Sequence, residues 1–530
     1  MVDMVVVEFA YEEMRRLIDL PRDKMIATLS ELGAPSEYEP EVKKIITELT
    51  PNRPDWYSME GLARALRAYH RDERPEYSAK KSAYKVSVDA SVAKIRPYTV
   101  CAVVKGLKFD DQRIRDAVLL QEKLLGTLGR KVKRFGLGIY PLSAIKFPVR
   151  YTTLKPEEIR YVPLGHDREM SAKEILEEHK KGQQYGHLIR GHPRFPVFVD
   201  AENRIMALIP VVNSAETGKI DESTTEIFIE VSGMDIHSCK AALNILVCTF
   251  ADMGGQVYEV MMEYGADKFA SPDLGTKKMK LDAKEVERVL GVKLPERDIK
   301  ALLAKMGYEY SHGIVHIPPY RADVMSQVDV IEDIAIAYGY NNFIPTLPDF
   351  FNPGETIKKY DRADGIMRGM GFVENTTFIL TNKESLAKIG FGGKAVEISN
   401  PSTVEYTVVR PNLIVSMLES FSTNKMKGLP QKFYEIGIVH DGTQKKRLVF
   451  GMMDRKVEFS DFRGVLQTLA FESGFGFQLR KAANAAFNAE ISAGVVSDGK
   501  NIGILGKVSP EVLEKFGIAF DVYICELELW

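Results

Sequence analysis

Residues 328–338 read Val-Asp-Val-Ile-Glu-Asp-Ile-Ala-Ile-Ala-Tyr, a stretch that is apolar apart from three carboxylates and one phenol. A helix that is apolar nearly all round is buried on most sides, so this stretch predicts a helix at the heart of a domain. Asp329, Glu332 and Asp333 are spaced i, i+3 and i+4, which places them on one arc of about 100°. We therefore expect these three carboxylates to converge on one spot.

Such a cluster would cost several kcal/mol if it were desolvated without a partner. A cation would offset this cost, and Asp323, six residues before Asp329, can supply a fourth oxygen. Hard oxygen ligands suit Mg²⁺. The alternatives are pairing with Arg321, pairing with a lysine or arginine of another protein, and exposure to solvent. These residues by themselves leave the alternatives open.

The sequence around this stretch predicts a small module. Helices are expected over 283–290, 296–306 and 326–338, with a short hairpin through His312-Gly313 between the last two. Two helices followed by a hairpin indicate a winged-helix-like domain over residues 272–345.

Polar stretches without apolar periodicity mark three boundaries, at 70–81, 270–278 and 345–355. They divide the chain into four predicted domains, 1–75, 83–268, 272–345 and 350–530. The second domain mixes strands, among them 98–104 and 226–231, with helices that do not alternate regularly with them. In the fourth, strands over 433–439, 448–452 and 522–529 predict an antiparallel sheet with flanking helices. The fold class is therefore α+β and multidomain.

The composition excludes several classes of protein. The 530 residues carry 71 Lys+Arg against 73 Asp+Glu, a net charge of −2, which excludes a polycation and restricts any nucleic-acid contact to local basic faces. The four cysteines form no CxxC pair and predict core residues in a reducing compartment. No run of about 18 apolar residues occurs, so we expect a cytoplasmic protein without a membrane span.

Two basic segments have a structural and a functional interpretation. In the helix predicted from Ser58 to His70, the residues Arg64, Arg67 and Arg71 share one face. Arg130-Lys131-Val132-Lys133-Arg134 is a compact basic run. Either could contact RNA phosphates, but a solvated surface is the default interpretation of both.

Motifs for nucleotide chemistry are missing, since the chain has no GxxxxGK[ST], no GxGxxG after a strand and no HExxH. The segment 474–480, Gly-Phe-Gly-Phe-Gln-Leu-Arg, places its arginine one residue too far for the GxGxxR arrangement of class II aminoacyl-tRNA synthetases. No Ser–His–Asp or Cys–His set can be assembled in the second domain. If that domain hydrolyses a substrate, it should position a water molecule.

Several ordered segments together resemble the β subunit of phenylalanyl-tRNA synthetase in its shorter archaeal and eukaryotic form, over nearly the whole chain. The segments that carry the resemblance are Asn52-Arg53-Pro54-Asp55, Glu60 to Arg64, Glu174 to His179, Tyr185 to Leu188, Val212-Asn213-Ser214, Pro319 to Val324 with 329–340, Asn400-Pro401-Ser402, Val409 to Leu413, Phe433 to Gly437, and Ile502 to Gly506 with Ser509 to Leu513.

The resemblance implies an (αβ)₂ heterotetramer in which the α subunit binds ATP and phenylalanine and charges tRNA(Phe). It implies that this chain carries a tRNA-editing domain at 83–268 and, at 350–530, a class II synthetase-like domain without the synthetic site. It also implies a magnesium ion shared with the α subunit, and its four positions match here as Asp323, Asp329, Glu332 and Asp333.

One segment departs from the family. Where the family tends to read Gly-Ile-His-Asp, this chain has Gly138-Ile139-Tyr140-Pro141, which puts editing in doubt if the segment lines the pocket. We expect the editing site around His187, Asn213 and Ser214, where side chains can orient water or the hydroxyl of a misplaced tyrosine. The alternative is a non-catalytic RNA-binding scaffold subunit whose editing site is inactive.

Overall fold

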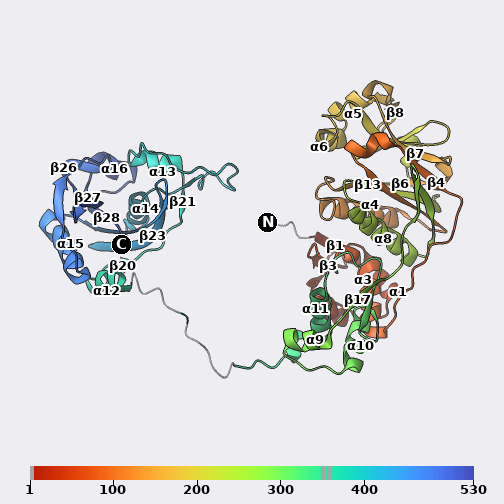
Figure 1. The fold of residues 1–530 in the computed structure, drawn as a ribbon, viewed down its shortest axis with the longest axis horizontal. Coiled ribbons are helices and arrows are strands. Elements are labelled where there is room, and N and C mark those ends of the chain that lie inside the picture. The colour runs from red at the N-terminus through yellow and green to blue at the C-terminus, as the bar shows by residue number, and fades with distance from the viewer. Residues whose placement is uncertain (1–4, 348–353, 355–360, 530) are drawn as a thin grey trace. The chain divides into compact units, whose positions relative to one another are not determined.

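The computed structural model describes residues 5–347, 354 and 361–529, and the chain divides into two compact units, residues 1–347 and 348–530. The division falls within the third predicted boundary, whose segment from Pro348 to Pro353 lies outside the described residues. Unit 1 contains the first three predicted domains, which share one continuous hydrophobic core. Figure 1 shows each unit as an arrangement of sheets with helices against them.

The N-terminal part of unit 1 is a three-stranded antiparallel sheet with helices, in the strand order β1-β3-β2. Its elements are β1 (Val5–Ala10), α1 (Tyr11–Leu17), α2 (Arg22–Glu31), β2 (Ser36–Glu39), β3 (Lys44–Leu49) and α3 (Met59–Arg71). The helix predicted from Ser58 to His70 is confirmed as α3, and the Ser58 side chain caps it by accepting from the Gly61 amide. A Cβ at Gly61 would lie 2.0 Å from the Asp55 carbonyl oxygen, so only glycine fits there.

The expectation that Arg64 lies on a solvated face is wrong. Its side chain is buried and forms an ion pair of 2.6 Å with Asp252. Contacts between distant segments cause this difference, because helix α8 (Ile236–Asp252) covers this face of α3.

The middle of unit 1 is built from two sheets packed face to face (Figure 1). The four-stranded sheet has the order β14-β5-β13-β6 and the seven-stranded sheet the order β12-β11-β10-β7-β4-β15-β16. The strands are β4 (Lys85–Val88), β5 (Tyr98–Lys105), β6 (Phe135–Pro141), β7 (Val149–Leu154), β10 (Phe195–Val199), β11 (Ile205–Leu208), β12 (Val212–Asn213), β13 (Glu226–Gly233), β14 (Gln256–Tyr258), β15 (Val260–Tyr264) and β16 (Asp267–Ser271). The strands predicted at 98–104 and 226–231 are confirmed as β5 and β13.

Alternation along these strands determines what each face contacts. Val100, Ala102 and Val104 of β5 pack toward helices α4 (Asp111–Gly126) and α8, whereas Cys101 and Val103 pack toward the seven-stranded sheet. The helices of this part are α4 (Asp111–Gly126), α5 (Ala172–Glu178), α6 (Lys180–Tyr185), α7 (Ala215–Gly218) and α8 (Ile236–Asp252). Two short strands, β8 (Arg160–Tyr161) and β9 (Met170–Ser171), pair beside α5.

The last part of unit 1 matches the predicted small module closely. Its elements are β17 (Lys277–Lys280), α9 (Ala283–Leu290), α10 (Glu296–Lys305), β18 (Glu309–Ser311), β19 (Ile314–Ile317) and α11 (Gln327–Tyr338), with the sheet order β17-β19-β18. All three predicted helices and the hairpin are confirmed. Helix α11 is buried through Val330, Ile331, Ile334 and Ala337, as its all-round apolar pattern predicts.

Unit 2 is a seven-stranded sheet flanked by helices, as predicted. The order is β20-β23-β24-β28-β27-β26-β25, and every pair is antiparallel except β20 with β23. The strands are β20 (Val373–Glu374), β23 (Gln431–His440), β24 (Gln444–Asp454), β25 (Gln478–Lys481), β26 (Phe487–Ser497), β27 (Lys500–Val508) and β28 (Asp521–Glu528). Helices α12 (Asp361–Gly369) and α15 (Phe459–Ser473) contribute to one core, and α13 (Lys383–Lys388), α14 (Ile414–Asn424) and α16 (Pro510–Lys515) to the other. A two-stranded sheet, β21 (Leu380–Thr381) with β22 (Val408–Val409), lies in the same unit.

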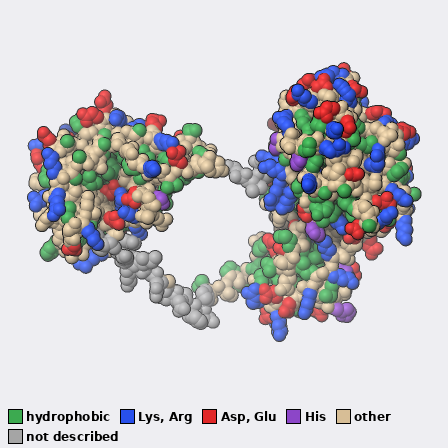
Figure 2. Space-filling model, turned by 45° about the horizontal axis from the view of Figure 1, so that its top comes forward, with side chains coloured by type: hydrophobic (Ala, Val, Ile, Leu, Met, Phe, Trp, Pro, Cys, Tyr) green, Lys and Arg blue, Asp and Glu red, His purple; other side chains and the backbone are tan. Residues whose placement is uncertain are grey.

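Three expectations from the composition can be compared with the structure. All four cysteines are buried and free, as core residues should be. Figure 2 shows basic and acidic side chains interspersed over the surface, in keeping with the small net charge. Every helix in the described part of the chain is too short or too polar to cross a bilayer.

Candidate functional site

A cavity of about 330 Å³ opens in the middle part of unit 1. Its wall is formed by helix α4, strand β6, the segment from Leu208 to Asn213 and the segment from Gly218 to Ile220. The wall is mostly apolar, with Ile114 and Ala117 from α4, Leu137 and Ile139 from β6, and Pro210 and Val211 beyond β11. A cavity of this size and character can hold an aromatic amino-acid side chain.

Among the described residues that line this cavity, Glu230 is the only acidic one. It lies in the middle of strand β13, only 1% exposed, and its Oε2 accepts a hydrogen bond of 2.5 Å from the Ser232 hydroxyl. Among the described residues its Oε1 has no hydrogen-bond partner of good geometry, although the Tyr140 phenol lies close enough to this carboxyl to lower its pKa. Burial raises the pKa of Glu230 to about 8, against the opposing effects of the Ser232 hydrogen bond, the Arg96 charge and the nearby Tyr140 phenol. At neutral pH the carboxyl is therefore mostly protonated, and can both donate to and accept from a ligand hydroxyl.

Tyr140, which departs from the family pattern, lies beside Glu230. Its phenol is fully buried and donates a hydrogen bond of 3.2 Å to Asn213 Oδ1. A Cβ at Gly138 would lie 2.5 Å from the Tyr140 hydroxyl and 2.8 Å from Glu230 Oε1. Glycine is therefore needed at this position of β6, because both polar groups lie against its backbone. Tyr140 therefore supplies a polar group to this region, although it is not the family's histidine. Pro141 ends β6 opposite Ile227 and is buried.

The structure does not bring the three predicted editing residues together. Asn213 lines the cavity at the end of β12. Ser214 is buried as the N-cap of α7, where its hydroxyl accepts from the Glu216 amide, and it is not among the described lining residues. His187 is exposed on a turn, with its Nδ1 3.1 Å from the Gln184 carbonyl oxygen, and is likewise absent from the described lining.

Glu230 was missed although the sequence holds a signal for it. It interrupts the apolar run Ile227-Phe228-Ile229 before Val231, in a strand predicted from its β-branched and aromatic residues. A carboxylate in the middle of a strand buried on both faces is costly unless it has a partner or a function. The sequence cannot show that a cavity opens against it, because the cavity wall comes from segments about 100 residues apart in the chain.

The expected convergence of the acidic residues at α11 is not found. Asp333 is buried and forms an ion pair of 2.7 Å with Arg321 and a hydrogen bond of 2.5 Å with the Tyr308 hydroxyl. Asp323 is paired with the same guanidinium through two hydrogen bonds, of 2.9 Å and 2.7 Å. Asp329 caps its own helix, because its Oδ2 accepts from the amides of Met325 and Ser326. Glu332 is exposed.

These residues, in this arrangement, do not fit a magnesium ion. The described part of the chain contains no group of three or more His, Cys, Asp or Glu side chains placed to hold a metal. The physical reason is that Arg321, buried with 1% of its side chain exposed, already neutralises two of the four carboxylates. Pairing with Arg321 was one of the alternatives that the sequence left open. The set Asp323, Asp329, Glu332 and Asp333 stays a prediction for a site shared with the α subunit.

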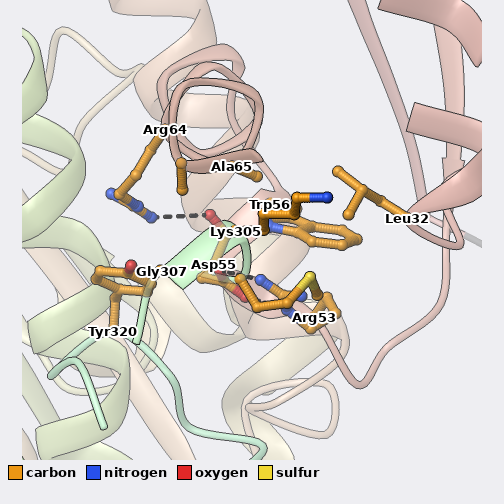
Figure 3. A pocket seen from close by; sticks show the side chains of 11 residues that line it. Leu32, Arg53, Asp55, Trp56, Arg64, Ala65, Lys305, Gly307 and Tyr320 are labelled. Carbon is orange, nitrogen blue, oxygen red and sulfur yellow. Dashed lines mark hydrogen bonds and ion pairs between the residues drawn. The ribbon is translucent and has the colours of Figure 1, made fainter. Parts of the chain in front are cut away.

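A second, much smaller cavity of about 20 Å³ lies where α3 meets residues 305–307 and Tyr320 (Figure 3). The Arg53 guanidinium lies 3.5 Å from the centre of the Trp56 ring and pairs with Asp55. Arg64 donates to the Asp55 carbonyl oxygen and lies over the Tyr320 ring at 4.0 Å. The space suffices for about one water molecule. This cluster joins the N-terminal part of unit 1 to its last part and offers no room for a substrate.

In unit 2 the segment that nearly matches GxGxxR does not form a phosphate site. Gly474 ends helix α15 with a φ of 79°, and Arg480 is exposed on the edge strand β25. This exposed position at the edge of the sheet gives no support for a nucleotide site in this segment.

Two family models match the chain and define the class of protein. Residues 279–340 match the tRNA synthetase B5 domain, and residues 345–529 match the phenylalanyl tRNA synthetase beta chain CLM domain. Together with an α+β fold of several antiparallel sheets, these matches indicate a subunit of an aminoacyl-tRNA synthetase.

Relatives that align with nearly the whole chain show which aminoacyl-tRNA synthetase subunit it resembles. The phenylalanine–tRNA ligase beta subunit of Archaeoglobus fulgidus is 37% identical over 99% of this chain and 98% of its own, and that of Methanothrix thermoacetophila is 33% identical over 99% and 100%. A solved N-terminal fragment of the phenylalanyl-tRNA synthetase beta subunit from Pyrococcus horikoshii superposes with a TM-score of 0.59 at 32% identity, covering 63% of this chain and 99% of that one. This chain belongs to the family of phenylalanine–tRNA ligase β subunits.

Proposed function

We propose that this β subunit works in an (αβ)₂ heterotetramer that attaches phenylalanine to tRNA(Phe), with ATP and phenylalanine bound by the α subunit. Its own contribution is assembly, tRNA binding and the hydrolysis of tyrosine from mischarged tRNA(Phe) in the cavity of unit 1. The family membership supports the first part, and the exposed position of Arg480 at a sheet edge agrees with it. The geometry around Glu230 supports the second.

The need for hydrolysis is physical. A pocket that binds phenylalanine by its apolar surface rejects tyrosine, which only adds a hydroxyl, by about a hundredfold at most. A second site must reverse the preference, with a polar group that phenylalanine would leave unpaired.

Glu230 is the observation that carries this proposal. Its Oε1 is buried without a hydrogen-bond partner of good geometry among the described residues, and Glu230 belongs to the wall of a mostly apolar cavity. We expect a tyrosine ring in this cavity to place its hydroxyl against the Glu230 carboxyl, whereas a phenylalanine ring offers that carboxyl no partner. The predicted preference is therefore for tyrosine, by the few kcal/mol that an unpaired buried polar group costs.

Hydrolysis itself needs no covalent nucleophile. A water molecule adds to the ester carbonyl, the bond to the ribose oxygen breaks, and one proton of the water passes to that oxygen. Asn213 is placed to orient this water or the substrate, since its side-chain oxygen is held by Tyr140 and its amide nitrogen remains available as a donor.

The test compares variants of the assembled enzyme on purified tyrosyl-tRNA(Phe). Glu230→Leu should lower the deacylation rate about a hundredfold with aminoacylation retained, while Glu230→Gln, which keeps a polar group, should lose much less. Glu226→Gln, on the same strand but paired with Lys105 at 3.4 Å, is the matched control. If Glu230→Leu deacylates as fast as wild type, the cavity is not the editing site. Failure of wild type to deacylate would favour the scaffold alternative and make Tyr140 and Pro141 the first positions to revert.

A further inference from the structure

The basic run Arg130 to Arg134 forms an unusual turn at the end of helix α4. Arg130, Lys131 and Val132 have φ values of 48°, 53° and 66°, so three successive residues other than glycine are left-handed. Each such residue is sterically disfavoured, and a β-branched valine most of all. Backbone strain of this kind persists only where the surroundings hold it, and it often marks a functional segment.

The surroundings hold this turn firmly. Val132 is 1% exposed, and its carbonyl oxygen accepts a hydrogen bond of 2.9 Å from Arg96, itself 3% exposed. The amides of Lys131 and Val132 donate to the carbonyls of Gly126 and Leu125 at the end of α4. The turn is therefore a fixed structure, which differs from the solvated loop that its composition suggests.

The turn lies at the cavity. Val132 and Leu125 are part of the cavity wall. Arg130, Lys131 and Lys133, the neighbours of Val132 in sequence, are exposed. Lys181 and Lys219 are also both exposed and part of the lining, which places them at its rim.

Within the described part of the chain, none of these cations has a carboxylate at ion-pair distance, although Lys219 acts on Asp221 through its charge. The ion pairs among the described residues include neither the basic residues of the turn nor the two lysines at the rim. A cation near the C-terminal end of a helix gains a little from the helix dipole, but that gain for a single charge is smaller than the cost of one left-handed residue. Helix capping therefore does not account for three strained residues and four charges.

We propose that the turn Arg130–Arg134 is a preformed phosphate clamp for the 3′-terminal strand of the RNA whose aminoacyl end enters the cavity. The inference rests on the proposed editing function, because an amino acid esterified to a terminal ribose brings the preceding phosphates to the rim of the cavity. Fixed, unpaired cations bind such phosphates without the entropic cost of ordering a flexible loop.

The test uses the assembled enzyme with the triple variant Arg130→Gln/Lys131→Gln/Lys133→Gln. The matched control is Lys277→Gln/Lys278→Gln/Lys280→Gln, which removes the same charge from exposed positions on β17. Two substrates are compared, tyrosyl-tRNA(Phe) and 3′-O-tyrosyladenosine, which has no phosphate. Binding of tRNA(Phe) is measured against salt by fluorescence anisotropy.

For the turn variant we expect the KM for tyrosyl-tRNA(Phe) to rise about tenfold or more and the slope of log K against log salt to fall by about 2. Hydrolysis of 3′-O-tyrosyladenosine should stay within about twofold of wild type, and the control variant should match wild type throughout. An unchanged KM and salt slope in the turn variant would overturn the proposal. So would an equal loss on both substrates, or an equal loss in the control.

Phosphate binding by the turn can be measured separately from ester hydrolysis in the cavity. If wild type hydrolyses neither ester, editing fails as a function of this chain. The salt slope of tRNA binding then decides the role of the turn by itself, since it does not depend on hydrolysis.

Discussion

Replacing Glu230 by glutamine should change how the stability of strand β13 depends on pH. The folded chain holds this carboxyl with a pKa of about 8, against an ordinary value of 4.5, chiefly because it is buried. Between these two values the unfolded chain has released the proton and the folded chain has kept it. The unfolded state then binds fewer protons, so the free energy of unfolding falls as the pH rises.

The magnitude follows from the two values. In this range the free energy of unfolding of wild type falls by about 1.4 kcal/mol for each pH unit. The full difference between 4.5 and 8 corresponds to about 5 kcal/mol. Glutamine has nearly the same size and no proton to lose. When the pH is raised from 5.5 to 7.5, the free energy of unfolding of Glu230→Gln should therefore rise by about 3 kcal/mol relative to that of wild type.

Hydrogen exchange of the β13 amides is the appropriate assay, because a chain with two compact units need not unfold in one step. Intrinsic exchange rates change with pH equally in both proteins and cancel in the difference. Glu226→Gln, at the half-buried start of the same strand, is the control for replacing a β13 carboxyl by an amide. Parallel pH profiles for Glu230→Gln and wild type would refute the reasoning, since they would mean that Glu230 is ionised in the folded chain.

Two further predictions concern the other candidate residues. Ser214→Ala should lower the stability of unit 1 by about 1 kcal/mol, the usual cost of losing an N-cap, with tyrosyl-tRNA(Phe) hydrolysis retained, whereas Asn213→Ala should lower hydrolysis with melting nearly unchanged. If Ser214→Ala instead lowers hydrolysis and Asn213→Ala instead lowers the melting temperature, then Ser214 acts on the substrate and Asn213 stabilises the fold. Calorimetric titration of the isolated chain with Mg²⁺ should give no stoichiometric binding, because Asp323 and Asp333 are already paired with Arg321. Tight binding by this chain alone would show that the four carboxylates rearrange into a complete site.

Local patterns in the sequence determined much of this protein. The buried helix α11 follows from apolar residues on all its sides, helix α3 from its amphipathic stripe and its serine cap, and strands β5 and β13 from their β-branched and aromatic residues. The family resemblance rests on ordered segments of this kind and is confirmed over 99% of the chain. These features depend on periodicity and capping, which act within a few residues.

Only the tertiary structure decided which side chains meet. Arg64 belongs to a polar helix face in the sequence, yet α8 covers it and pairs it with Asp252, 188 residues away. Asp329 and Asp333 share one arc of α11, yet one caps the helix while the other turns to Arg321 and Tyr308. Glu230 and the turn at Val132 lie about 100 residues apart and meet at one cavity. Contacts of this range depend on how elements pack, and the spacing of residues within one element does not encode that packing.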